Sequence, residues 1–289
     1  YFQRLGKLIR DRDYDLLWIE KEILPYVPEW LERILIQNIP YAVDYDDAQF
    51  HTYDYYGSKL TKMFLAQKID NVMAHAQLVI AGNKYIAIRA NKAGAKSIEI
   101  IPTVIDLDRY SIKSDDQSRI FNIGWIGSPG TSSYLNAIQS VFENVNHKYD
   151  CTFTLVGAGQ LKLGNIDLII KDWHESSEVE DIKTFDVGIM PLDNTPWEQG
   201  KCGIKLIQYM ACALPVVGTP IGVNQEIIAH GVNGFQANTL DEWTAYLSKL
   251  ATDPHLCSVM GAKGRAMVES NYCLQVTAPK LAQLLRGCI

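Results

Sequence analysis

The segment DVGIMPL at residues 186–192, followed by GKCGIKLIQYMACALPVVGTPIGVNQEI at residues 200–227, decides the fold. The first run is apolar and has the length of a strand, and Pro191 ends it. A polar loop follows, and Gly203 then begins a helix whose apolar residues recur at helical spacing until Pro215. Such a strand, glycine loop and helix N-terminus form an anion site, because backbone N–H groups and the helix dipole point to one place.

The same alternation of strands and helices runs through the whole chain, which predicts parallel sheets covered by helices on both faces. In the first half we predict strands at 15–19, 41–43, 78–81 and 97–101, and helices ending at 8–12 and spanning 28–37, 57–76 and 85–93. In the second half we predict strands at 120–126, 152–156, 167–170, 186–192 and 216–217, and helices at 134–146, 178–184, 203–214, 240–251, 254–270 and 272–287. The polar stretch 102–116 is predicted to be an interdomain hinge.

These blocks, together with GWIGSPGT at 124–131 and HGVNGFQA at 230–237, resemble the nucleotide-sugar-binding half of GT-B glycosyltransferases, specifically glycosyltransferase family four (glycosyl transferases group 1). The resemblance is dense from Phe121 to Phe235 and thinner before Asp106. It implies an α/β fold of the GT-B type, with two Rossmann-like domains that face a cleft. Members of the family are retaining enzymes.

The resemblance implies three parts. Residues 1–105 would form the acceptor-side domain, residues 106–270 the nucleotide-sugar-binding domain, and residues 271–289 a helix that crosses back to the first domain. The first residues already read like the middle of a domain, and the strand and glycine-rich loop with which the family begins are missing. We therefore expect the first domain to be incomplete at its N-terminus.

Composition excludes several classes of protein. The net charge of −6 argues against nucleic acid as the main partner, and no apolar run approaches the roughly 20 residues of a membrane helix. There is no signal-peptide pattern, and the six cysteines lack CxxC or metal-ligand spacing. We therefore expect reduced thiols in a cytoplasmic protein.

The loop at 127–133 follows the first strand of the second domain, at the edge of the sheet where open α/β folds bind ligands. Gly127 lets a ligand approach the backbone, and Ser128 and Thr131 can donate to phosphate. By themselves these residues would be ordinary caps of the next helix. The family resemblance favours the phosphate role.

The stretch 200–208 is the sharpest candidate site. The family usually has two glutamates eight residues apart, one near the donor sugar and one on the ribose, and here those positions are Gly200 and Gln208. Gln208 can still accept a hydrogen bond from a ribose hydroxyl. Glu198, two residues early, is an open substitute for the first glutamate.

The backbone N–H groups of Lys201, Cys202 and Gly203 are expected to face the sugar and phosphates. Lys201 and Lys205 would supply positive charge for the leaving diphosphate, with Lys205 in a catalytic role. The alternative is two solvated lysines. Trp173 precedes a short helix and would either stack on the nucleobase or belong to the core.

The acidic run DYDD at 44–47 ends a first-domain strand and has three interpretations. Asp44 and Asp46 match the DxD metal motif of the other glycosyltransferase fold, GT-A. Alternatively, Asp46 or Asp47 stabilises positive charge on the donor sugar, as the cleft-facing loop of GT-B proteins would. The third possibility is a helix cap with surface charge. We prefer the second, with no metal.

Weaker candidates lie elsewhere in the first domain. Glu22 or Lys21 would face the acceptor, and Tyr53, Tyr55 and Tyr56 would form a sugar-stacking platform. His51 is a weak candidate, because a lone histidine is more often structural. One predicted helix carries Lys59, Lys62 and Lys68 beside Leu60, Met63, Phe64 and Leu65. Ordinary amphipathic packing is the favoured interpretation of this helix. Peripheral contact with the inner face of an anionic membrane, or contact with a lipid-linked acceptor, stays open as an alternative.

The resemblance therefore predicts retaining transfer of a sugar from a UDP- or GDP-type nucleotide sugar to an acceptor hydroxyl, without a required cofactor. The acceptor would be a carbohydrate or a lipid-linked carbohydrate, in polysaccharide or glycoconjugate synthesis. Two alternatives stay open. One is a non-catalytic nucleotide-sugar-binding scaffold, and the other is a nucleotide-sugar epimerase on the same fold.

Overall fold

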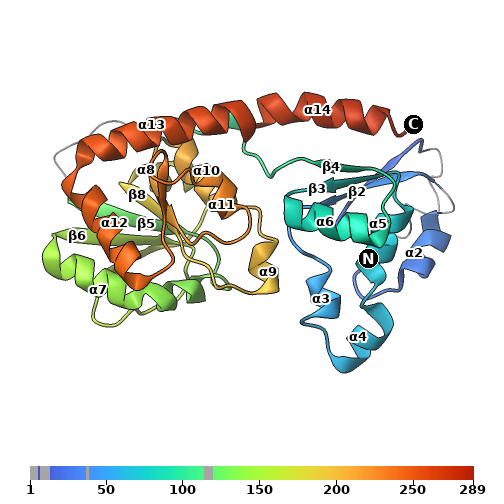
Figure 1. Cartoon of the computed structure of the whole chain (residues 1–289), viewed down its shortest axis with the longest axis horizontal. Coiled ribbons are helices and arrows are strands. Elements are labelled where there is room, and N and C mark those ends of the chain that lie inside the picture. The colour runs from blue at the N-terminus through green and yellow to red at the C-terminus, as the bar shows by residue number, and fades with distance from the viewer. Residues whose placement is uncertain (1–5, 7–13, 37–38, 114–119) are drawn as a thin grey trace. The chain divides into compact units, whose positions relative to one another are not determined.

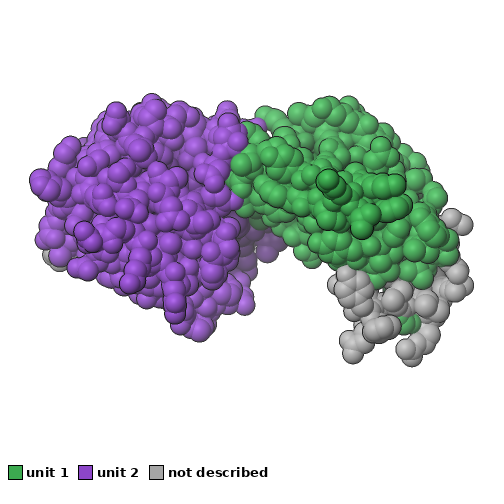
Figure 2. All heavy atoms as spheres, turned by 90° about the horizontal axis from the view of Figure 1, so that it is seen from below, with its two compact units in different colours: residues 1–103, 195–202, 277–289 green, residues 104–194, 203–276 purple. Residues whose placement is uncertain are grey.

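The computed structural model describes residues 6, 14–36, 39–113 and 120–289. The chain divides into two compact units, shown in Figures 1 and 2. Unit 1 comprises Tyr1–Thr103, Thr195–Cys202 and Thr277–Ile289, and unit 2 comprises Val104–Asn194 and Gly203–Val276. The helix end predicted at 8–12 lies outside the described residues. The predicted domain boundaries at 105/106 and 270/271 stay predictions.

Unit 1 contains a parallel sheet of strand order β1-β2-β3-β4. Its strands are β1 (Leu17–Glu20), β2 (Tyr41–Tyr45), β3 (Leu78–Ala81) and β4 (Ile98–Ile100). The two central strands, β2 and β3, are almost entirely buried, as expected when helices cover both faces of a parallel sheet. The apolar runs at 41–43 and 78–81 predicted them for that reason.

Helices cover the two faces of this sheet. One apolar cluster holds side chains from α2 (Glu29–Ile36), α5 (Lys68–His75) and α6 (Lys84–Ala93) against the strands. On the other face, Leu281 and Leu284 of α14 (Leu274–Arg286) pack near Ala42, Leu78 and Ile80. The short helices α3 (His51–Asp54), α4 (Lys59–Leu65) and α9 (Pro196–Gln199) complete the unit.

Unit 2 contains a six-stranded parallel sheet of order β10-β9-β8-β5-β6-β7. Its strands are β5 (Phe121–Ile126), β6 (Cys151–Val156), β7 (Leu168–Lys171), β8 (Val187–Met190), β9 (Val216–Gly218) and β10 (Gly234–Gln236). The order reverses at β5, which lies between β8 and β6. In open α/β sheets such a reversal marks the crevice that binds ligands.

The helical segments of unit 2 are η1 (Leu107–Arg109), η2 (Ser132–Ile138), α7 (Gln139–Lys148), α8 (Glu178–Lys183), α10 (Ile204–Ala211), α11 (Asn224–Ile227), α12 (Leu240–Thr252) and α13 (Pro254–Asn271). Local signals set several of their ends. Thr239 and Glu242 form a capping box on α12, and Asp253 caps α13 ahead of Pro254. Among the described residues, no helix combines the length and the apolar character needed to cross a bilayer.

The strand predictions are confirmed to within two residues at each end, but β10 was not predicted and two helix predictions need correction. The segment 134–146 begins as the 3-10 helix η2 and becomes α-helical only at Gln139. The single helix predicted at 57–76 is two helices, α4 and α5, separated at Ala66 and Gln67. Lys68, predicted to lie on the surface of that helix, is buried.

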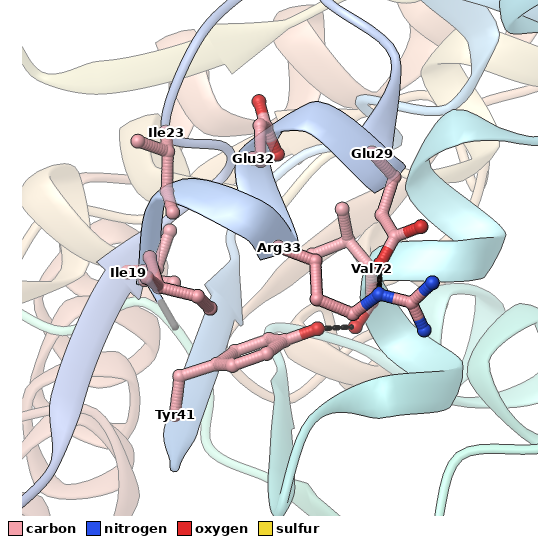
Figure 3. A pocket seen from close by; sticks show the side chains of 8 residues that line it. Ile19, Ile23, Glu29, Glu32, Arg33, Tyr41 and Val72 are labelled. Atoms are coloured by element: carbon pink, nitrogen blue, oxygen red, sulfur yellow. Dashed lines mark hydrogen bonds and ion pairs between the residues drawn. The ribbon is translucent and has the colours of Figure 1, made fainter. Parts of the chain in front are cut away.

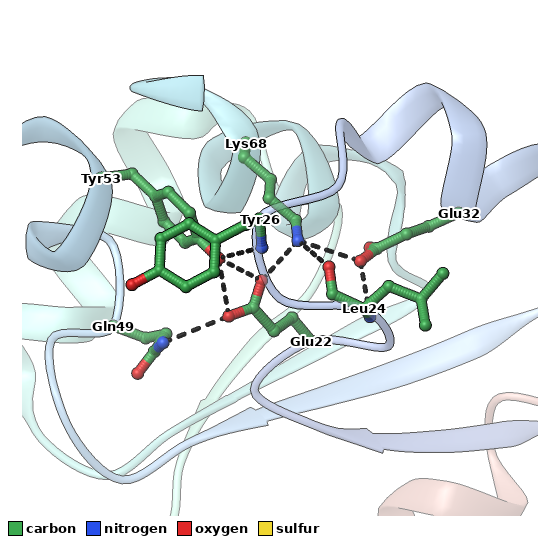
Figure 4. Close-up of polar contacts among 7 residues, drawn as sticks. All are labelled: Glu22, Leu24, Tyr26, Glu32, Gln49, Tyr53 and Lys68. Carbon is green, nitrogen blue, oxygen red and sulfur yellow. Dashed lines mark hydrogen bonds and ion pairs between the residues drawn. The ribbon is translucent and has the colours of Figure 1, made fainter. Parts of the chain in front are cut away.

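A buried polar cluster in unit 1 explains the break between α4 and α5 (Figure 4). Lys68 Nζ lies 2.5 Å from Glu22 Oε2 and 3.0 Å from Glu32 Oε1, and it also donates to the carbonyl oxygen of Leu24. Tyr53 donates to Glu22, at 2.7 Å. The first residue of α5 therefore points into the unit, while α4 turns outward.

The same cluster holds the chain between β1 and α2. Glu32 accepts the backbone N–H of Leu24 at 2.8 Å, and the Tyr53 hydroxyl accepts that of Tyr26 at 3.0 Å. Tyr26 has a positive φ of 61°, which an L-residue adopts only when its surroundings hold it there. Burial raises the pKa of Glu32, although the backbone N–H of Leu24 and the Lys68 ammonium oppose this.

Replacing Lys68 should strongly destabilise unit 1. In Lys68→Met the carboxylates of Glu22 and Glu32 stay buried without their cation, which typically costs about 3–5 kcal/mol. We expect a loss of this size in urea unfolding at neutral pH, shrinking as the pH falls and Glu32, whose pKa is raised by burial, takes up a proton. Lys92→Met, on the exposed surface of α6, is the matched control. Equal unfolding midpoints for the two variants would contradict the role given to the cluster.

Candidate functional site

Two loops meet at the carboxyl ends of β5 and β6. The N–H of Gly127 donates to the carbonyl oxygen of Val156 at 3.0 Å. Gly157 has a φ of 75°, and a Cβ atom placed on it would lie 2.1 Å from the carbonyl oxygen of Gly127. The loops therefore pack backbone against backbone, which only glycine permits at position 157.

Lys205 of α10 lies against the first of these loops. Its ammonium is 4.1 Å from the ring centroid of the buried Trp125 and 3.3 Å from Oγ1 of Thr131. A Cβ on Gly127 would lie 2.5 Å from Lys205 Nζ, so glycine leaves the space that this side chain occupies. The structure thus brings three predicted site residues together: Gly127, Thr131 and Lys205.

Ser128 shapes this loop through a turn. Its N–H donates to Thr131 Oγ1 at 3.2 Å, and its carbonyl oxygen accepts the N–H of Thr131 at 2.9 Å. The N–H groups of Gly127 and Ser128 are therefore engaged within the protein in this structure. The Thr131 hydroxyl is engaged as well, since it donates to the carbonyl oxygen of Ser128 at 3.1 Å. An anionic ligand at this loop would therefore interact with the Lys205 ammonium of α10 and, after exchange of that hydrogen bond, with the Thr131 hydroxyl.

A chain of hydrogen bonds runs from Trp173 to Gln208. Trp173 Nε1 donates to Glu178 at 2.8 Å, Tyr110 donates to the other Glu178 oxygen at 2.6 Å, and Gln208 Nε2 donates to the Tyr110 hydroxyl at 3.1 Å. Burial raises the pKa of Tyr110, and the Glu178 carboxylate reinforces the shift. Tyr110 therefore remains a neutral hydroxyl that links the two ends of the network.

Trp173 is not a core residue, which removes one of its two predicted roles. Its side chain is 47% exposed, although its indole nitrogen is tied to Glu178. A Cβ atom placed on Gly157 would lie 3.1 Å from the Cβ of Trp173, so the Trp173 side chain starts beside the junction of the two loops. An exposed aromatic ring with a fixed orientation is a suitable surface for stacking a planar group.

The sequence reasoning missed Glu178 and Tyr110. Glu178 is the first residue of α8, where a carboxylate is common at a helix N-terminus and carries no specific signal. Tyr110 lies in the stretch 102–116, which was predicted to be a polar hinge. Their importance arises from a contact between residues 68 positions apart, which neither local pattern reveals.

The residues just before α10 depart from expectation. Lys201 and Cys202 belong to unit 1, whereas Gly203 belongs to unit 2 and begins α10 with a φ of 70°. The N–H of Lys201 donates to the carbonyl oxygen of Glu198 at 3.2 Å, so it closes the turn of α9 and does not face a ligand in this structure. Glu198 itself is buried and accepts from the Thr195 hydroxyl.

Gly200 has no room for a side chain. A Cβ on this residue would lie 2.3 Å from the Cβ of Ala48, far inside contact distance. Asn83 fixes the approach, because its amide nitrogen donates to the carbonyl oxygens of Gly200 at 2.8 Å and Lys201 at 3.3 Å. The same side chain caps α6 by accepting the N–H of Ile86 at 3.0 Å. A glutamate at position 200 is therefore incompatible with this packing.

The acidic run begins inside β2, because the strand extends through Tyr45 and not only to Val43. Asp46 pairs with Lys21 at 3.1 Å and also accepts the N–H of Asp47. Burial raises the pKa of Asp47, reinforced by Asp46 and opposed by Lys201. Within the described part of the chain, no group of three or more His, Cys, Asp or Glu side chains is placed to hold a metal ion.

Burial excludes some of the other first-domain candidates from contact with a ligand. Tyr53 is fully buried in the polar cluster, so it cannot join Tyr55 and Tyr56, which are exposed, in a stacking platform. Glu22 is likewise buried and does not face an acceptor. His51 is buried between Asp54 and the Tyr85 hydroxyl, at 2.7 and 2.9 Å, as a structural histidine would be.

A small cavity beside α2 is also unsuited to a ligand (Figure 3). Ile19, Glu29, Arg33 and Tyr41 are among its lining residues, and its volume is about 10 Å³. That is no more than the space of a single water molecule. The Tyr41 hydroxyl donates to the carbonyl oxygen of Val72 and takes part in holding β2 to α5.

Comparison with known proteins agrees with the geometry. Residues 118–253 match the family described as glycosyl transferases group 1. Sucrose-phosphate synthase from Thermosynechococcus elongatus is 14% identical, with a TM-score of 0.71 over 95% of this chain and 73% of the other. HepE from Anabaena is 17% identical, with a TM-score of 0.70 over 98% of this chain and 80% of the other. A comparison with curated proteins gave no significant match.

The chain is therefore an α/β protein of the GT-B fold. It is a glycosyltransferase, and its residues 118–253 are similar to the glycosyl transferases group 1 family. This assignment favours sugar transfer over the scaffold and epimerase alternatives.

Asp44 gives a testable pH dependence. Burial, reinforced by the charges of Asp46 and Glu20, raises its pKa from 3.8 to about 6. The folded state thus binds this proton more tightly than the unfolded state, and the corresponding stability is lost as the pH rises through about 4 to 6. Asp44→Asn should therefore stabilise the protein by about 1–2 kcal/mol at pH near 7.5 and have little effect near pH 4. Thermal unfolding at both values tests this; an equal effect at both would rule it out.

Proposed function

We propose that unit 2 binds the nucleoside diphosphate of a nucleotide-sugar donor at the carboxyl ends of β5, β6 and β7, and that the chain transfers the sugar to an acceptor hydroxyl with retention of configuration. One observation carries the proposal. The Lys205 ammonium lies beside the Thr131 hydroxyl and the Gly127 backbone, at the point where the strand order of the sheet reverses. A cation and a hydroxyl at that place suit a diphosphate.

The diphosphate is the leaving group of this reaction. When the bond between the anomeric carbon and the phosphate oxygen breaks, the diphosphate gains negative charge and the sugar gains positive charge. Lys205 is held before the reaction by Trp125 and Thr131, so it stabilises that negative charge without being reorganised. Lys201 and the backbone of Cys202 and Gly203 are proposed to add to the field at the phosphates.

The exposed ring of Trp173 is proposed to stack on the nucleobase. Its tie to Glu178 fixes the ring plane, and Gln208 at the other end of the network offers its amide oxygen to a ribose hydroxyl. HepE has been determined with UDP and glucose, and the pneumococcal transferase GtfA with UDP and GlcNAc. These relatives of the fold support a UDP-type donor for this chain, with GDP as the alternative.

The positive charge on the sugar is proposed to be met by Asp46 or Asp47. The released diphosphate oxygen then takes the proton of the acceptor hydroxyl as the new glycosidic bond forms on the same face of the sugar. The acceptor is proposed to be a carbohydrate or lipid-linked carbohydrate, in polysaccharide or glycoconjugate synthesis in the cytoplasm. No metal or additional cofactor enters this scheme.

Calorimetry with UDP, GDP, ADP and CMP, each with and without Mg²⁺, tests donor binding. We expect one nucleoside diphosphate to bind without metal and Lys205→Ala to weaken it about tenfold or more, since a charge-assisted hydrogen bond to phosphate is lost. Lys263→Ala, on the exposed surface of α13 in the same unit, is the control and should bind as the wild type does. Binding of none of the four nucleotides, or binding that ignores Lys205, would refute the proposed donor site.

The stereochemical claim has its own test. Slow hydrolysis of the donor in the absence of acceptor releases the free sugar, whose first-formed anomer is visible by proton NMR before mutarotation. A retaining enzyme acting on an α-linked nucleotide sugar should release the α-anomer first. Initial release of the β-anomer would show inversion.

A further inference from the structure

Helix α4 presents an apolar face to solvent. Leu60, Met63 and Phe64 follow the i, i+3, i+4 spacing that places side chains on one side of a helix, and they are 69%, 75% and 69% exposed. An amphipathic helix packed on its own domain would bury this face; here only Leu65 of α4 is buried. The favoured sequence-based interpretation, ordinary amphipathic packing, is therefore wrong for α4.

The apolar surface continues onto α2. Trp30 and Ile34, one helical turn apart, are 53% and 60% exposed. Trp30, Met63 and Phe64 line one open groove of about 520 Å³, which Pro28 and Lys62 also border. Two helices of unit 1 thus contribute large apolar side chains to one groove, and the exposed Ile34 and Leu60 lie one helical turn from Trp30 and Phe64 on the same helices. We call these five residues the α2–α4 face (Trp30, Ile34, Leu60, Met63 and Phe64). A contiguous exposed patch of this kind marks an interaction site more often than chance.

The charges around this face are positive, although the chain as a whole carries −6. Helix α4 contains Lys59 and Lys62 and has no acidic side chain. Helix α2 carries two carboxylates, those of Glu29 and Glu32, and both are buried, although Glu29 also borders the groove. Glu32 points to Lys68, as Figure 4 shows, and Glu29 lies near Arg33 and His75.

We propose that the α2–α4 face docks on an anionic lipid bilayer surface. Its large apolar and aromatic side chains would enter the headgroup boundary, while Lys59 and Lys62 reach the phosphates with their long side chains. This composition, apolar residues with flanking lysines on short helices, fits an interface in which one side is hydrocarbon and the other anionic. The proposal goes beyond sugar transfer and does not depend on the donor site.

The fold holds this face rigidly, which lowers the cost of docking. Helix α5 begins at Lys68, which is buried and bound to Glu22 and Glu32. The chain that follows the exposed helix α4 is therefore fixed in the interior of the unit. Ser58 caps α4 at its other end by accepting the N–H of Thr61 at 3.2 Å. The apolar side chains are therefore presented by an ordered helix with both ends fixed, and not by a loop that must first fold on the membrane.

Vesicle co-sedimentation of the whole chain tests the proposal. We expect binding to phosphatidylcholine vesicles that contain phosphatidylglycerol, and much weaker binding to phosphatidylcholine alone. Phe64→Glu should lower the partition coefficient about tenfold or more, because a buried aromatic side chain is lost from the interface. Ile88→Glu, an exposed apolar residue on α6 that is 56% accessible, is the matched control and should change it less than about twofold.

A second pair of variants tests the electrostatic part. Lys59→Glu combined with Lys62→Glu should reduce binding to the anionic vesicles about tenfold or more, whereas Lys92→Glu combined with Lys96→Glu should not. Raising the salt from about 0.1 M to 1 M shortens the Debye length from about 10 Å to 3 Å and should weaken wild-type binding. All of these side chains are on the surface, so the variants should unfold at the wild-type temperature.

Two results would overturn the proposal. One is failure of the wild-type chain to co-sediment with anionic vesicles, or binding that Phe64→Glu leaves intact. The other is dimerisation in light scattering that Phe64→Glu abolishes without any vesicle binding, which would assign the face to a second copy of the chain. UDP calorimetry on Phe64→Glu keeps the two functions apart: lost vesicle binding with normal nucleotide binding is the expected result. Absent nucleotide binding in the wild type, with vesicle binding retained, would count only against the donor site.

Discussion

The backbone contact between Gly127 and Gly157 is the constraint on which the donor side of the molecule depends. Strands β5 and β6 pair in parallel up to Ile126 and Val156, so both chains leave the sheet at the same level. Their loops can then run side by side only because position 157 lacks a Cβ and accepts a positive φ. This single contact places the loop that meets Lys205 next to the segment that carries Trp173. The phosphate-facing and base-facing groups of the proposed site are therefore set by main-chain geometry before any ligand arrives.

The sequence predicted the parts of this arrangement that depend on local pattern. Apolar runs of strand length and helices of period near 3.6 are repeated signals, and they placed β5, β6, β8 and α10 close to where they lie. Glycines after strands pointed to the loop at 127–131, because open α/β sheets bind ligands at that edge. Lys205 and Thr131 meet for the same reason, since the loop after β5 and the helix after β8 flank neighbouring strands.

What the sequence could not predict is decided by contacts between distant residues. The segment 57–76 has a continuous helical pattern, yet it breaks because Lys68 finds Glu22 46 positions away in the interior. Lys201 and Cys202 precede a helix as a donor loop would, but their segment belongs to unit 1, where Asn83 binds the carbonyl oxygens of Gly200 and Lys201. Trp173 has the same local pattern whether buried or exposed, and only its tertiary surroundings, which leave the side chain 47% exposed, separate the two cases. In each case a tertiary partner overrides a local preference.

In unit 1, the arrangement of the buried charged side chains determines which apolar side chains are exposed at the surface. A buried ion cluster contributes little net stability compared with an apolar core, because desolvating three charges offsets most of their attraction. Its value lies in geometry: Glu22, Glu32 and Lys68 can be satisfied together only if α2 and α5 turn these side chains inward. That same rotation turns Trp30 and Ile34 outward on α2, and it requires the break after which α4 displays Leu60, Met63 and Phe64. The buried acids thus leave an apolar surface with lysines at its border. An exposed apolar surface of that composition can arise from the packing requirements of the interior, without any long apolar segment in the sequence.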